Sequence, residues 1–219
     1  MKMMSLFACI ILPILFLLPV NGFSQVYTPG ISAYTDIAFG YGGWHTFGFG
    51  FTVNDINGIN VTALGYYDRW QDGIFNDHQI GIWNSSGILL TSNTLKAWEG
   101  YLINDFRYVN LTSNFHLSYG SDYYIGAIPS GLDGFVHVVD VVTDPSITFL
   151  GSFYGVMDII APSPELVFPN INFPHASDVI LTNFLKESQV IPEPSMVVLF
   201  ISGFLGLLNF KWLRKRFFK

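Results

Sequence analysis

The stretch HQIGIWNSSGILLTSNTL, residues 78–95, decides the fold class of this chain. Ile80 and Ile82 alternate with smaller or polar neighbours, which is the pattern of a strand with one buried face. A second β-prone run begins at Ile88, and the residues between the two runs, 84–87, have the composition of a tight turn. The stretch therefore predicts an antiparallel β-hairpin.

Similar β-branched and aromatic runs, separated by Gly, Asn, Asp, Ser and Pro, fill residues 25–189, and helical periodicity is scarce. A segment of this length can bury a sizeable core as one domain. The pattern predicts an all-β fold, namely an antiparallel jelly-roll-like β-sandwich. Strands are expected at residues 46–53, 60–67, 78–83, 88–95, 105–111, 123–128, 135–142, 147–154 and 179–184.

The composition excludes several classes of protein. Half of the 219 residues are hydrophobic and 12% are charged, which is the reverse of a disordered chain. A single cysteine, Cys9, excludes a disulfide scaffold. All sixteen acidic residues but only four of the ten basic ones lie between residues 25 and 194, so this segment carries 4 − 16 = −12. Such a charge repels phosphates and argues against nucleic acid as a partner.

The amino end has the pattern of a secretory signal peptide. Lys2 precedes an uncharged hydrophobic run at 6–20, and small residues allow cleavage after Ser24. We therefore expect residues 1–24 to direct export through the Sec translocon and to be removed together with Cys9. An uncleaved membrane anchor is the alternative.

The carboxyl end predicts a single transmembrane helix. Residues 196–210 are uncharged, and basic residues follow them. Their positive charge favours a cytoplasmic tail, which makes a membrane span a better interpretation than a buried core helix. The basic tail comprises Lys211, Arg214, Lys215 and Arg216.

A short motif, Pro192-Glu193-Pro194, stands directly before this expected helix. The motif, the helix and the basic terminus, in this order over residues 190–219, resemble the PEP-CTERM sorting signal of Gram-negative bacteria. The resemblance implies recognition by an exosortase at the inner membrane, then release to the cell surface or to an extracellular exopolysaccharide matrix. A permanent anchor without processing is the alternative.

The segment between the two ends also shows a resemblance. Val61-Thr62-Ala63-Leu64-Gly65-Tyr66-Tyr67-Asp68, the later His78-Gln79-Ile80-Gly81-Ile82-Trp83 and Tyr123-Tyr124-Ile125-Gly126-Ala127 resemble a DUF4082-like β-sandwich module of exported bacterial proteins. The resemblance covers residues 46–184 and implies a jelly-roll-like sandwich. The resemblance implies no catalytic residues.

Motifs of catalysis are missing from the sequence. There is no Gly-x-Ser-x-Gly, no His-Glu-x-x-His and no phosphate-binding glycine loop before a helix. The five histidines stand singly, which is more typical of packed residues than of zinc ligands. We expect no enzyme activity and no organic cofactor. A secreted hydrolase acting through two carboxylates stays an alternative.

The loop at residues 68–77 is the candidate metal site. It holds four oxygen ligands of the kind that Ca²⁺ prefers, and Gly73 permits a tight turn. The alternative is an Asx-rich turn in which Arg69 neutralises one carboxylate. The candidate ligands are Asp68, Asp72, Asn76 and Asp77.

Two tryptophans in polar surroundings, Trp70 and Trp98, are candidates for stacking on sugar rings. Trp83 lies among isoleucines and is expected in the core. Together these features predict a non-catalytic exported protein of the cell surface or extracellular matrix. The alternatives are a carbohydrate-binding module with a specific polysaccharide ligand and, less favoured, a hydrolase.

Overall fold

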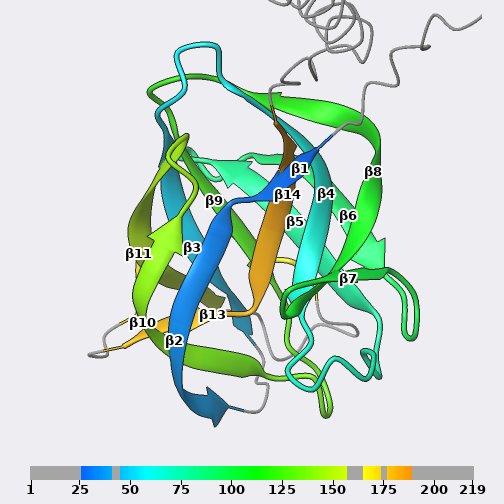
Figure 1. Ribbon diagram of the computed structural model, residues 1–219. Coiled ribbons are helices and arrows are strands. Elements are labelled where there is room, and N and C mark those ends of the chain that lie inside the picture. The colour runs from blue at the N-terminus through cyan, green and yellow to red at the C-terminus, as the bar shows by residue number, and fades with distance from the viewer. Residues whose placement is uncertain (1–25, 41–44, 157–164, 174–176, 189–219) are drawn as a thin grey trace, which may run out of the picture. The chain divides into compact units, whose positions relative to one another are not determined.

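The computed structural model describes residues 26–40, 45–156, 165–173 and 177–188. Residues Tyr27–Ser188 form one compact unit. All named strands in this unit pair in antiparallel fashion, and they form three sheets (Figure 1). The predicted all-β class is therefore confirmed. The predicted signal peptide and transmembrane helix lie outside the described residues.

The strands are distributed over the three sheets as follows. The five-stranded sheet has the order β1 (Tyr27–Pro29), β14 (Thr182–Glu187), β4 (Ile59–Tyr67), β8 (Phe106–Leu117) and β7 (Tyr101–Ile103). The six-stranded sheet has the order β12 (Ile171–Asn172), β11 (Ile147–Val156), β3 (His45–Val53), β9 (Asp122–Ala127), β5 (His78–Asn84) and β6 (Leu89–Leu95). The three-stranded sheet has the order β13 (Asp178–Ile180), β10 (Phe135–Thr143) and β2 (Ile31–Gly40).

Most of the core lies between the five-stranded and six-stranded sheets, and the three-stranded sheet adds Ile31, Val136, Val138, Val179 and Ile180 to it. Phe51 of β3 and Phe184 of β14 are both fully buried, and their ring centroids are 5.0 Å apart. Tyr66 of β4 stacks on His78 of β5 at 3.7 Å. Aromatic contacts of this kind across the two sheets make the fold sandwich-like.

The hairpin predicted at residues 78–95 is present as β5 and β6. Its turn is held by Asn84, whose side-chain oxygen accepts hydrogen bonds from the backbone N–H groups of Ser86 and Ile88 at 3.1 and 2.9 Å. Gly87 has a φ of 79°, a conformation that glycine adopts without strain. Local turn chemistry therefore fixed this part of the fold, as the sequence indicated.

The other predicted strands are present with three corrections. The strand expected at 105–111 continues to Leu117. The last expected strand is two strands, β13 and β14, separated by Leu181. Four strands were not predicted: β1, β2, β7 and β12. Three of these four have two or three residues, and β2 is mostly exposed, so none of them has a clear alternation of buried and exposed residues.

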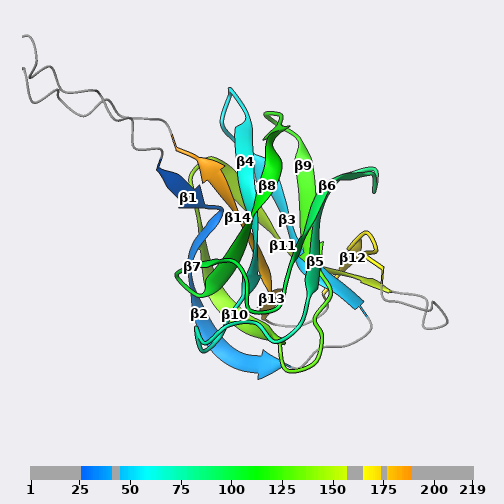
Figure 2. The same ribbon diagram turned by 90° about the vertical axis from the view of Figure 1, so that its right-hand side faces the viewer.

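The pairing of β1 with β14 places the first and the last strand of the domain side by side. Tyr27 of β1 pairs with Glu187 of β14 (Figures 1 and 2). At the opposite end of β14, Thr182 pairs with Tyr66, directly before the loop at residues 68–77. The chain therefore enters and leaves the domain at the end of the strands that is remote from this loop.

Candidate functional site

Exposed apolar side chains gather at the end of the domain that carries the 68–77 loop. The β6–β7 and β9–β10 connections reach the same end, because Leu95 pairs with His78 and Ala127 pairs with Ile80. We call this group the aromatic surface. Its members are the exposed Trp70, Phe75, Trp98 and Leu132, together with the half-buried Phe39.

The two tryptophans predicted for sugar stacking are both exposed there. Trp70 is 58% exposed and Trp98 is 63% exposed, whereas Trp83 is 3% exposed and lies in the core as predicted. Trp70 lies 5.6 Å from the ring of Phe39, and Trp98 contacts Phe75 edge-on at 4.8 Å. Each indole is therefore supported by a second aromatic ring and still faces solvent, which is the arrangement of a stacking platform.

The backbone of Trp98 adopts a left-handed conformation with a φ of 64°. This conformation is uncommon for a bulky residue and costs about 1–3 kcal/mol. The backbone N–H of Trp98 donates to the carbonyl oxygen of Ile74 at 3.0 Å, which joins the β6–β7 connection to the 68–77 loop. The strain maintains an exposed indole, so it points to a role for that indole other than packing.

Two buried carboxylates hold the 68–77 loop from its two sides. Asp68 Oδ2 accepts hydrogen bonds from the backbone N–H of Gly73 at 3.1 Å and from Arg107 Nε at 2.8 Å. Asp133 Oδ2 accepts hydrogen bonds from the backbone N–H groups of Phe75 and Asn76, both at 2.8 Å. The loop that carries Trp70 and Phe75 is thus fixed by side chains from β8 and from the β9–β10 connection.

A buried histidine completes the support beneath the loop. His78 Nε2 lies 3.1 Å from Asp133 Oδ2, and His78 Nδ1 lies 2.9 Å from the carbonyl oxygen of Ile128. Both ring nitrogens of this buried histidine therefore lie within hydrogen-bond distance of an oxygen acceptor. Tyr66, which stacks on this ring, donates its hydroxyl proton to the carbonyl oxygens of Asp133 and Gly134 at 2.9 and 3.1 Å. These groups are engaged in structural hydrogen bonds.

The environment of Asp133 favours its ionised form. Burial alone raises the pKa of this carboxyl group. The hydrogen bonds from His78, Asn76 and Phe75, together with the charge of His78, outweigh burial and bring the pKa below its ordinary value. The His78–Asp133 pair was not expected from the sequence, because the two residues are separated by 55 positions and neither belongs to a spaced motif.

The predicted calcium ligands are mostly engaged with protein donors. Asp68 binds Arg107, and Asp77 accepts hydrogen bonds from Lys96 Nζ and the backbone N–H of Ala97. The side-chain nitrogen of Asn76 donates to the backbone oxygen of Ser130 and to Asp133. Asp72 lines a small hollow beside Trp70.

Within the described residues, no group of three or more His, Cys, Asp or Glu side chains is placed to hold a metal ion. Calcium binding stays a prediction, and an unchanged melting temperature in millimolar Ca²⁺ and in chelator would contradict it. The turn interpretation needs one correction, because Arg107, and not Arg69, neutralises Asp68.

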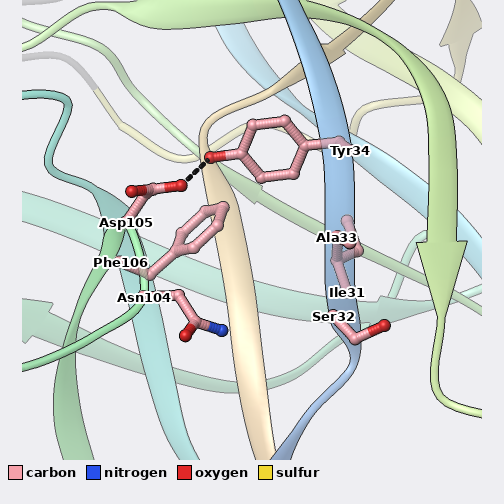
Figure 3. A pocket seen from close by; sticks show the side chains of 7 residues that line it. All are labelled: Ile31, Ser32, Ala33, Tyr34, Asn104, Asp105 and Phe106. Carbon is pink, nitrogen blue, oxygen red and sulfur yellow. Dashed lines mark hydrogen bonds between the residues drawn. The ribbon is translucent and has the colours of Figure 1, made fainter.

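A larger hollow lies between β2 and the β7–β8 turn (Figure 3). Tyr34 points across it and donates its hydroxyl proton to Asp105 Oδ2 at 2.8 Å. Burial and this hydrogen bond raise the pKa of Tyr34 far above its ordinary value, so the hydroxyl stays protonated as a donor. The contact ties β2 to the five-stranded sheet, which is a structural role.

The residues of the predicted sorting signal, Pro192, Glu193 and Pro194 and the basic tail, lie outside the described residues. Among the residues that the structure does describe, none forms a helix with the length and apolarity of a membrane span. Comparison with known proteins finds no matching family model, no matching curated protein and no matching solved structure.

Proposed function

We propose that this chain is a non-catalytic protein exported by a Gram-negative bacterium to its cell surface or extracellular matrix. The signal-peptide pattern at residues 1–24 and the sorting motif at 190–219 support export and processing by an exosortase. In this proposal the body is a jelly-roll-like sandwich that is held transiently in the inner membrane by its carboxyl end.

The place where the chain leaves the domain agrees with this route of export. The chain leaves the domain after β14, at the end remote from the aromatic surface. A domain held through residues 188 onward is therefore held at the end that does not carry Trp70 and Trp98.

The processing step has a direct test. The mass of the mature protein recovered from the cell surface is expected to lack residues 1–24 and the segment after the Pro-Glu-Pro motif. Substitution of Pro192, Glu193 and Pro194 by alanine is expected to leave the longer form in the inner membrane. A mature protein that retains residues 196–219 would instead support a permanent anchor.

A second candidate function is carbohydrate binding, and one observation favours it. Trp98 is exposed and is held in a strained left-handed conformation on the same aromatic surface as an exposed Trp70. Exposed indoles in fixed orientations offer large apolar faces on which sugar rings can stack. We propose that the matrix role is carried out through polysaccharide binding at the aromatic surface.

The test of this second function is retention of the full chain, in mild detergent, on a panel of immobilised polysaccharides. Trp98→Ala and Trp70→Ala are expected to weaken retention. Tyr119→Ala is the matched control, because Tyr119 is 54% exposed but lies in the β8–β9 connection, at the other end of the strands. Equal retention of all three variants would contradict the function.

A further inference from the structure

The described part of the domain has one basic side chain without a carboxylate partner. Four lysine and arginine residues occur there, and the exposed Arg69 is the one for which no salt bridge to a described residue is found. The other three are paired: Lys96 with Asp77 at 2.7 Å, Arg107 with Asp68 at 2.8 Å and Lys186 with Asp144 at 3.2 Å. In a segment with a charge of −12, this exposed guanidinium at the aromatic surface is available to an acidic ligand.

Two aromatic rings orient this guanidinium. The Cζ atom of Arg69 lies 4.5 Å from the ring centroid of Phe39 and 5.4 Å from that of Trp70. A cation over aromatic rings is attracted to their faces. Since stacking engages the face of a guanidinium, its N–H donors at the edge stay available for a planar oxygen ligand.

The neighbouring groups suit a sugar that carries an acid. Trp70 offers its face for a sugar ring, and Asp72, which lines the same hollow, can accept hydrogen bonds from sugar hydroxyls. A guanidinium forms two parallel hydrogen bonds with a carboxylate, and such charge-assisted bonds are about twice as strong as neutral ones.

We infer that the aromatic surface binds a carboxylated polysaccharide, with Arg69 binding the carboxylate and Trp70 stacking on the same sugar. This inference rests on the carbohydrate-binding function proposed above and adds the chemical class of the ligand to it.

Three carboxylates line the same hollow as Arg69, and two of them, Asp68 and Asp133, are already engaged with protein donors. Asp72 is the third. Charges separated by more than about 8 Å are largely screened at physiological ionic strength, whereas the Arg69–carboxylate pair is in direct contact.

The test measures the affinity of the full chain, in mild detergent, for three uronate polymers: alginate, hyaluronan and polygalacturonate. The affinity for each polymer is compared with the affinity for its carboxyl-reduced form, which keeps the sugar backbone and loses the charge. The variants are Arg69→Gln, which removes the cation, and Arg69→Lys, which keeps the charge but not the planar donors. Lys96→Gln is the control, because it removes one positive charge from the same end of the domain.

The expected result is binding of at least one uronate polymer that falls about tenfold in Arg69→Gln, less in Arg69→Lys and not in Lys96→Gln. Affinity for the carboxyl-reduced polymer should be unchanged by Arg69→Gln. Equal losses in Arg69→Gln and Lys96→Gln would show that only net charge acts, and would overturn the inference. So would a wild-type preference for the reduced polymers, or binding of neutral polysaccharides alone.

Those last two outcomes leave carbohydrate binding intact, provided that Trp98→Ala still weakens it. If no polysaccharide is bound, or if Trp98→Ala has no effect on any of them, the proposed function itself fails together with the inference.

Discussion

Asp133 is the residue that joins most contacts beneath the aromatic surface. One of its oxygens receives hydrogen bonds from the backbone of Phe75 and Asn76 and faces the buried ring of His78. Removing a buried acceptor is costly, because the two backbone N–H groups that donate to it are left without a partner. Replacement of Asp133 is therefore expected to lower the stability of the folded domain.

We predict that Asp133→Asn lowers the free energy of unfolding by about 2–4 kcal/mol, measured by urea denaturation. Asp140→Asn is the control, because Asp140 is exposed and has a φ of 54°, a conformation that asparagine accepts. Equal stability of the two variants would show that the His78–Asp133 pair does not support the fold.

Asp133 stabilises the fold, whereas the left-handed backbone conformation of Trp98 costs stability. We predict that Trp98→Asn changes the free energy of unfolding by less than about 1 kcal/mol, because relief of backbone strain offsets the lost contact with Phe75. Trp70→Asn has no strain to relieve and should be the more destabilised variant. A larger loss in Trp98→Asn than in Trp70→Asn would contradict this account.

At the scale of elements, the close approach of β3 and β9 depends on paired glycines. Gly48 pairs with Gly126, and a Cβ atom on Gly48 would lie 1.7 Å from the backbone oxygen of Ile125. On the same strand, a Cβ on Gly50 would meet the ends of the Phe153 and Tyr124 rings at 3.0 and 3.2 Å. Backbone cannot yield in the way that a side chain can.

We therefore predict that Gly48→Ala is more destabilising than Gly50→Ala, by at least about 1–2 kcal/mol in thermal or urea unfolding. A difference in the other direction would mean that β3 and β9 are not paired in this register.

The elements that were predictable from the sequence are those with local signals. The β5–β6 hairpin has alternating Ile80 and Ile82 and a turn whose asparagine caps its own backbone. The long edge strand β2 was missed, because most of its residues are exposed and its neighbour among the described strands, β10, is about a hundred residues away in sequence. Pairing of that kind is set by tertiary contacts rather than by periodicity.

The candidate site likewise has one part that was predictable from the sequence and one part that was not. Trp70 and Trp98 were identified from their polar neighbours in the sequence, and both are exposed. The support beneath them was not predictable, because Asp68 and Asp133 reach their partners across loops that are far apart in the chain. The role of Arg69 was interpreted wrongly for the same reason, since its nearest carboxylate in sequence is bound by Arg107.

At the scale of the whole molecule, stability should depend on buried carboxylates. Burial raises the pKa of Asp144, but hydrogen bonds from Ser146 and the interactions with Lys186 outweigh it and leave the pKa below the ordinary value, as for Asp133. A carboxyl group with a lowered pKa binds fewer protons in the folded state than in the unfolded state. Its stabilising contribution is therefore present above the unfolded pKa of about 4 and is lost as the pH falls below it.

We predict that the free energy of unfolding falls steadily as the pH drops from about 4 toward 2.5, with a shallower fall in Asp133→Asn. Urea denaturation at fixed ionic strength provides the measurement. The same slope in both proteins would mean that Asp133 does not contribute to acid unfolding.

The central claim, that one end of the domain binds polysaccharide, has its most direct test in hydrogen–deuterium exchange of the full chain, with and without the polysaccharide panel. The account predicts that a bound polysaccharide slows exchange in the loops at residues 68–77, 97–100 and 128–134. Exchange at residues 54–58 and 118–121, at the other end of the strands, should not change. Protection confined to that other end, or no protection by any polysaccharide in the panel, would contradict the account.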